Sequence, residues 1–201
     1  MRLYLASASP RRLELLRRAG WNPLVVAQSA DETPLDGELP EATVRRLAVA
    51  KAASARAGPD AGAQAGLVLA ADTEVVSGDR ILGKPKDDDD ARAMLAGLAG
   101  RTHRVITGVA WESVDGAQRG ARVETTEVAF HDVGAAAIDA YVATGSPRDK
   151  AGAYGLQDLD ESWIAAVRGL RSNVIGLPVE RLRAWIGCAL PAPQSPDVSG
   201  S

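Results

Sequence analysis

Apolar runs alternate with helical patterns along the chain, which predicts a domain that mixes strands and helices. Residues 67–71 are apolar throughout, as expected of a strand buried on both faces. Residues 40–57 instead repeat apolar positions at the three- and four-residue spacing of one helical face. The same reading predicts further strands at residues 2–6, 24–27, 74–77, 80–82, 101–113, 122–132, 162–167 and 172–175. Further helices are predicted at residues 10–19, 87–98, 135–142 and 178–188.

This order of elements predicts an α/β or α+β fold class, and no linker splits the pattern into independent domains. We therefore expect one domain over residues 1–190. The tail of residues 191–201 consists largely of Pro, Ser, Gly and Asp, and we expect it to be disordered.

Composition narrows the class of protein. The 201 residues are 46% hydrophobic, with 23 Lys and Arg against 26 Asp and Glu. A domain of this length buries roughly 70% of the surface of its unfolded chain and needs no disulfide. Cys188 is the single cysteine, which excludes an intramolecular disulfide framework or a cysteine-rich zinc site. A net charge of −3 argues against a partner that is duplex nucleic acid.

Membrane insertion and export are not expected either. No apolar run reaches the roughly 18 residues of a membrane span. The apolar start, residues 2–8, is too short for a signal peptide. We therefore expect a soluble, cytoplasmic protein.

The segment Ser7-Ala8-Ser9-Pro10-Arg11-Arg12 joins a predicted strand to the start of a predicted helix. Free N–H groups and the helix dipole attract anions at such a point, and two hydroxyls and two guanidiniums add donors for phosphate oxygens. The same residues also fit a plain helix start, with a serine cap, a proline in the first position and two solvated arginines. Spacing alone does not separate the two interpretations.

Asp72 follows the apolar run of residues 67–71, at the carboxyl end of a predicted central strand. Open α/β sheets usually bind ligands at this edge. A carboxylate there can bind Mg²⁺ or orient and deprotonate a water molecule. The alternative is an aspartate that caps its own turn.

Residues 78–84, Gly-Asp-Arg-Ile-Leu-Gly-Lys, nearly match a phosphate-binding P-loop. Pro85 stands where that loop has the hydroxyl that holds Mg²⁺, and the neighbouring residues predict a strand rather than a helix. We therefore reject a P-loop. Lys84 remains a candidate phosphate-binding charge, with a simple exposed lysine as the alternative.

Lys51 lies on the apolar side of the helix predicted at residues 40–57. Because lysine is rarely buried without a partner, Lys51 needs a nearby anion or must reach water. Glu32, in the acidic loop of residues 29–39, is a candidate metal ligand or a solvated carboxylate. The four aspartates at 87–90 fit the first turn of a helix better than a metal site.

The sequence excludes zinc-dependent chemistry and serine-hydrolase chemistry. The only histidines, His103 and His131, lack the i, i+4 partner of a zinc-binding helix. The chain also has no Gly-x-Ser-x-Gly nucleophile motif.

Taken together, the motifs resemble the Maf family of nucleoside triphosphate pyrophosphatases, in family order over roughly residues 3–187. The matching motifs are Ser7 to Arg12, Asp31-Glu32, Arg46-Leu47-Ala48 with Lys51, Ala71-Asp72-Thr73, Gly83-Lys84-Pro85, residues 149–157 and residues 174–178.

The resemblance implies a fold related to the inosine-triphosphatase group, with an elongated mixed sheet, flanking helices and two lobes around a deep cleft, commonly as a homodimer. It implies hydrolysis of a nucleoside triphosphate to the monophosphate and pyrophosphate with a divalent metal, Mg²⁺ or Mn²⁺. Position by position, it makes Asp72 the proton acceptor and Lys51 and Lys84 further catalytic residues. Glu32 and Asp72 become the implied metal ligands. The implied substrate-binding residues are Ser7, Ser9, Arg11, Arg12, Thr73 and Gln157.

Arg11, Thr73 and Gln157 resemble the branch of the family associated with dTTP and UTP, rather than the branch that prefers 7-methyl-GTP. Modified pyrimidine triphosphates fit the same chemistry. One departure is Asp158, which follows Gln157 where that branch usually has glycine. We expect this change to affect loop shape and base tolerance. The family also suggests an alternative function, a nucleotide-binding regulator of septum formation or cell division with little catalysis. Retention of Asp72 favours catalysis, because a pure binder needs no carboxylate that activates water.

Overall fold

The computed structural model describes residues 1–33, 35–56 and 65–193. Within these ranges the strands are β1 (Arg2–Leu5), β2 (Leu24–Val25), β3 (Gly66–Ser77), β4 (Arg80–Leu82), β5 (Thr102–Ser113), β6 (Arg119–Phe130) and β7 (Ile164–Arg168). The α-helices are α1 (Pro10–Arg18), α2 (Pro40–Arg56), α3 (Asp88–Leu98), α4 (Ala135–Ala143), α5 (Arg171–Ile175) and α6 (Val179–Ile186). Short 3₁₀ helices are η1 (Ser146–Asp149), η2 (Ala151–Ala153), η3 (Glu161–Trp163) and η4 (Gly187–Ala189).

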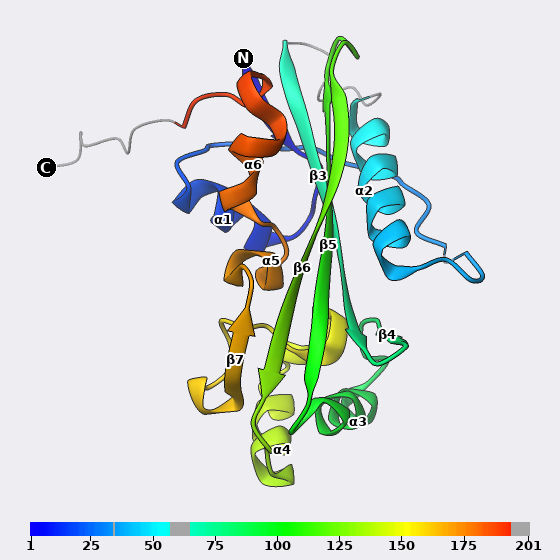
Figure 1. Cartoon of the computed structure of the whole chain (residues 1–201), viewed down its shortest axis with the longest axis vertical. Coiled ribbons are helices and arrows are strands. Elements are labelled where there is room, and N and C mark those ends of the chain that lie inside the picture. The colour runs from blue at the N-terminus through cyan, green and yellow to red at the C-terminus, as the bar shows by residue number, and fades with distance from the viewer. Residues whose placement is uncertain (34, 57–64, 194–201) are drawn as a thin grey trace, which may run out of the picture. The chain divides into compact units, whose positions relative to one another are not determined.

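The strands form one sheet in the order β2-β1-β3-β5-β6-β7, with β4 paired to β3. The sheet is mixed, because β1 runs parallel to β2 and β3 whereas β3–β4 and β6–β7 are antiparallel. Helices accompany the strands along the chain (Figure 1). The predicted α/β class, a mixed sheet with flanking helices, is therefore confirmed.

Contacts divide the chain into two compact units, and β3, β5 and β6 contribute residues to both. Unit 1 comprises residues 1–72, 108–123 and 176–201, and unit 2 comprises residues 73–107 and 124–175. Each unit is described by itself. The prediction of a single domain over residues 1–190 stays a prediction.

In unit 1, the strand alternation sorts side chains onto two faces. Leu3, Leu5, Leu67 and Leu69 pack in one cluster with residues of α1 and α6. The intervening side chains pack in a second cluster with α2, which lies across the strands from α6 (Figure 1). This is the period of two expected for strands buried on both faces.

Helix α2 sits unusually close to β5 at Gly108. A Cβ atom built on Gly108 would lie 2.2 Å from the carbonyl oxygen of Val44, which is far inside van der Waals contact. Only glycine permits this approach of helix backbone to strand backbone. The contact fixes the position of α2 along the strands. It thereby also fixes the position of every side chain on the buried face of the helix.

In unit 2, a separate apolar core packs α3 and α4 against the strands. Its centre is aromatic: Phe130 makes edge-to-face contacts with His103, Tyr154 and Trp163. The predicted hairpin is confirmed, since β3 and β4 pair from Ser77–Arg80 to Val75–Leu82 around Gly78. Gly78 has a φ of 59°, a conformation that favours glycine in tight turns.

Two element predictions were wrong. Residues 172–175, predicted as a strand, belong to helix α5. Their apolar Val-Ile pair suits a strand, but the amide of Asn173 donates to Val105 O and Thr126 Oγ1, and this tertiary contact fixes a helical turn. The strands predicted at 67–71 and 74–77 are one continuous strand, β3, which carries Asp72 within it.

No helix in the described part of the chain has the length and apolar character needed to cross a bilayer. The predicted disordered tail begins at residue 191, and its residues from 194 onward lie outside the described residues. Pro191 itself accepts a hydrogen bond from Trp21 Nε1 at 2.9 Å.

The buried His103 makes unit 2 sensitive to acid. Its side chain is 2% exposed, and burial lowers its pKa from 6.5 to about 4. Below pH 6.5 the unfolded chain binds a proton that the folded chain rejects, so stability falls as the pH drops. We predict a loss of about 2 kcal/mol in unfolding free energy between pH 7 and pH 5 from this group alone.

Urea unfolding at several pH values measures this loss. A His103→Asn variant, although less stable at pH 7, should lose most of the slope between pH 7 and pH 5. An unchanged slope in the variant would show that His103 is not the group responsible.

Candidate active site

An ion pair between a strand and a helix forms the centre of the site in unit 1. Lys51 Nζ lies 2.6 Å from Asp72 Oδ1. Asp72 shares a strand face with Val68 and Ala70, and those residues pack against α2. Lys51 lies two turns after Val44 on the buried face of the helix. The two periodicities therefore bring the strand carboxylate and the helix ammonium together.

The loop before α2 adds a second carboxylate. Glu32 Oε1 lies 3.0 Å from Lys51 Nζ, although the Glu32 side chain is 54% exposed. Arg46 ties this loop to the helix, because its guanidinium donates to both carboxylate oxygens of Glu38 and to the carbonyl of Thr33. Lys51, only 7% exposed, thus has two anionic partners. The sequence predicted that Lys51 needs a nearby anion or must reach water, but it did not identify Asp72 as that anion.

The turn between β1 and α1 caps the helix and also holds a buried hydroxyl beside Arg12. Ser9 caps α1 by accepting from the N–H of Arg12, with Pro10 in the first position. Ser7 Oγ, which is buried, accepts from Ser9 N and from Arg12 Nη1, both at 3.2 Å. These bonds occupy both lone pairs of the Ser7 hydroxyl, so its O–H remains as a donor. The serine cap with Pro10 in the first position is confirmed, and anion binding at this turn stays a prediction.

Arg12 is held by a hydrogen bond to a residue that is far from it in the sequence. Its Nε donates to the carbonyl of Gly176 at 2.9 Å. Burial lowers the pKa of the Arg12 guanidinium; the nearby Asp72 carboxylate opposes that shift, and the charge of Arg11 adds to it. Gly176 lies within the motif of residues 174–178, and this contact supplies a physical reason for that motif. The sequence did not predict this contact.

Five charged side chains therefore gather in unit 1. Three are cations and two are carboxylates: Arg11, Arg12, Lys51, Glu32 and Asp72. Arg46, with its partner Glu38, also interacts with Asp72. Cations arranged in this way can attract a phosphate group.

The two carboxylates also bear on the implied metal. No group of three or more His, Cys, Asp or Glu side chains in the described residues forms a metal-binding cluster. Glu32 and Asp72, joined through Lys51, are only two ligands. Mg²⁺ typically uses one or two carboxylates and completes its shell with water and substrate phosphates. Glu32 and Asp72 therefore fit the implied divalent cation, with the rest of its shell supplied by water or substrate.

In unit 2, Thr73 belongs to a buried hydrogen-bond chain. Thr73 Oγ1 lies 3.0 Å from Thr107 Oγ1, and Thr107 donates to the carbonyl of Asn173 at 3.1 Å. A carbonyl only accepts, so the single hydroxyl hydrogen of Thr107 is used there. Thr73 must then donate to Thr107. The direction of the Thr73 hydroxyl is thus set by Thr107 and Asn173, which are both fully buried.

The other two predicted residues of unit 2 are exposed. Lys84 follows Gly83, whose carbonyl accepts from the N–H of Gly152 at 3.0 Å. Gln157 sits at the corner of a turn closed by Asp158 N donating to Gly155 O at 2.9 Å. Both side chains are therefore accessible to a ligand.

Comparison with known proteins agrees with these motifs. A family model described as "Maf-like protein" matches residues 2–188. The chain is similar to the dTTP/UTP pyrophosphatase of Sphingopyxis alaskensis, at 48% identity over 185 residues, which cover 92% of this chain and 94% of that protein. It is also similar to the dTTP/UTP pyrophosphatase of Shewanella frigidimarina, at 45% identity, covering 92% and 96%. Among solved structures, the Ham1 protein of Staphylococcus aureus matches with a TM-score of 0.45 at 14% identity, covering 66% of this chain and 73% of that one.

Because Thr107 joins Thr73 to the Asn173 carbonyl, we predict that two small substitutions of Thr107 lower the stability by different amounts. Thr107→Val keeps the shape but removes the hydroxyl, leaving the Asn173 carbonyl and the Thr73 hydroxyl without this partner. We expect a loss of about 1–2 kcal/mol in unfolding free energy. Thr107→Ser keeps the hydroxyl and should lose less. Urea denaturation of both variants measures the difference, and equal losses would contradict the network.

Proposed function

The chain belongs to the Maf family, and we propose that it hydrolyses nucleoside triphosphates, dTTP and UTP in particular, to the monophosphate and pyrophosphate. The Lys51–Asp72 pair is the observation that carries this proposal. It places a strand carboxylate beside the ammonium of α2 and near the Arg12 guanidinium. The names of the relatives support the pyrimidine substrates.

The reaction needs one water molecule. Lys51 holds Asp72 through Oδ1, and we assign the second oxygen, Oδ2, to the water. Its oxygen bonds to the α-phosphorus while one proton passes to Asp72. The bond from the α-phosphorus to the bridging oxygen breaks, and pyrophosphate leaves with the bonding pair. Phosphoryl transfer of this kind depends mainly on positioning and charge stabilisation.

The cations of unit 1 divide the remaining work. Arg12 and the Ser7 hydroxyl donate to phosphate oxygens. Lys51 exchanges part of its contact with Glu32 for the incoming phosphate. Glu32 and Asp72 would hold a divalent cation, Mg²⁺ or Mn²⁺, which supplies Lewis-acid polarisation of the phosphate. Thr73, Lys84 and Gln157 stay predicted substrate contacts of unit 2.

A homodimer and a cytoplasmic location stay predictions. Modified pyrimidine triphosphates stay within the proposed substrate class, because one added small group changes selectivity by only about 1–3 kcal/mol.

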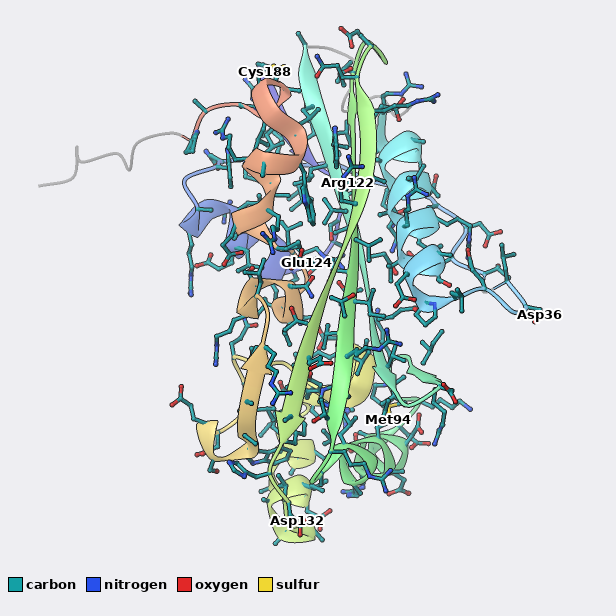
Figure 2. All side chains as sticks on the ribbon, in the orientation of Figure 1. Asp36, Met94, Arg122, Glu124, Asp132 and Cys188 are labelled. Carbon is teal, nitrogen blue, oxygen red and sulfur yellow. The ribbon has the colours of Figure 1, made fainter. Side chains whose placement is uncertain are left out.

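The proposed base predicts a large effect of Asp72→Asn. With dTTP and Mg²⁺, turnover should fall by about 10²- to 10⁴-fold, the size of a lost general base. Asp36→Asn is the matched control, since Asp36 lies in the loop before α2 and is exposed (Figure 2). Chromatography of dTMP and pyrophosphate measures both variants. Near-normal turnover by Asp72→Asn would remove Asp72 from this role, and binding of dTTP by the wild type without turnover would favour the regulatory function instead.

A second prediction concerns substrate choice. Arg11→Trp should shift preference away from dTTP and UTP, because a guanidinium is replaced by an apolar ring at a proposed substrate contact. A panel of pyrimidine and purine triphosphates, including 7-methyl-GTP, measures the profile. The same profile in wild type and variant would break the assignment of Arg11.

A further inference from the structure

The segment that carries Gln157 is held in an unfavourable backbone conformation. Ala153 has a φ of 61°, in the left-handed region that residues other than glycine rarely adopt. Such a residue persists only where its surroundings hold it. Tyr154, the next residue, is fixed by a 2.7 Å hydrogen bond between its hydroxyl and His103 Nε2. The start of the segment is therefore held by the core of unit 2.

The other end of the segment, at Asp158, contacts the buried ammonium of Lys150. Lys150 is 7% exposed, and its Nζ donates to the carbonyl and the hydroxyl of Ser146. Two carboxylates balance its charge: Asp149 at 2.8 Å and Asp158 at 3.2 Å. A buried ammonium is tolerated only with such partners.

Asp158 joins this ammonium to the turn that presents Gln157. Its Oδ2 accepts from the Ser146 hydroxyl at 2.8 Å and lies near Lys150, while its N–H closes the turn on Gly155. The side chains of Asp158 and Lys150 pack directly on that turn. A Cβ atom built on Gly155 would lie 2.6 Å from Asp158 Oδ2 and 2.7 Å from Lys150 Cε. The turn that presents Gln157 is therefore joined through the Asp158 side chain to Ser146 and Lys150.

We propose that Asp158 is a positioning residue for substrate choice: through Lys150 and Ser146 it holds Gln157 in the orientation that reads the base. This inference rests on the proposed function, in which Gln157 contacts the base. A primary amide offers a donor and an acceptor side by side. It matches the adjacent carbonyl and N–H of uracil and thymine only if its backbone is held. Asp158, the departure from the family pattern, thus rigidifies the turn.

The test compares two substitutions that each remove one carboxylate from the same ammonium. Asp158→Asn loosens the turn at Gln157, whereas Asp149→Asn acts eight positions away from Gln157 in the sequence. The probes are non-hydrolysable α,β-imido-dTTP and α,β-imido-dATP, whose dissociation constants are measured by calorimetry. Steady-state kinetics with dTTP accompany them, and thermal melts check that both variants fold.

In Asp158→Asn, we expect the preference for the thymine over the adenine analogue to fall about tenfold, the size of a lost charge-assisted hydrogen bond. KM for dTTP should rise by a similar factor, with kcat nearly unchanged. Asp149→Asn should keep the wild-type preference. Ser146→Ala, which removes only the hydroxyl contact, should shift the preference in the same direction by less.

Three results would overturn the inference: an unchanged preference in Asp158→Asn, an equal loss in Asp149→Asn, or no preference in the wild type. The proposed function fails separately. A wild-type protein that prefers the thymine analogue but releases no dTMP from dTTP refutes hydrolysis, while the binding ratios still decide the role of Asp158.

Discussion

A buried lysine that must have an anion shapes the site in unit 1. Lys51 comes from an otherwise apolar helix face, and its 2.6 Å contact with Asp72 exists only if strand and helix meet in one register. The close approach of α2 at Gly108 fixes that register, because any side chain there would push the helix away. The lack of a side chain at Gly108 on β5 therefore allows α2 to place Lys51 beside Asp72.

Such an ion pair is poor evidence for stability, because desolvation of two charges offsets their attraction. Its value in this protein is electrostatic. Lys51 shares its charge between Asp72 and the exposed Glu32, while Arg12 is held beside them by the Gly176 carbonyl. In the proposed reaction, cations that are already in place need little reorganisation when charge develops at phosphorus.

Local patterns predicted the elements and most of the charged residues, but not their partners. The helical spacing marked Lys51 as a residue in need of an anion, and the contact with Glu32 confirmed it. The Asp72 contact was missed because it depends on how far α2 slides along the strands, which no local pattern encodes. The same holds for Asn173, whose buried amide turned a predicted strand into helix α5. The roles of Asp158 and Lys150 also need tertiary contacts, although the unusual aspartate after Gln157 was visible in the sequence. Cys188, in the short helix η4 that follows α6 (Figure 2), is exposed, although a lone cysteine in such a sequence is usually a buried residue.

The position of water attack tests the central claim most directly. Hydrolysis of dTTP in H₂¹⁸O, followed by mass spectrometry of the products, locates the new oxygen. The account predicts one ¹⁸O atom in dTMP and none in pyrophosphate, because the water activated by Asp72 bonds to the α-phosphorus. Label in pyrophosphate or release of labelled orthophosphate would place the attack at another phosphorus and contradict it.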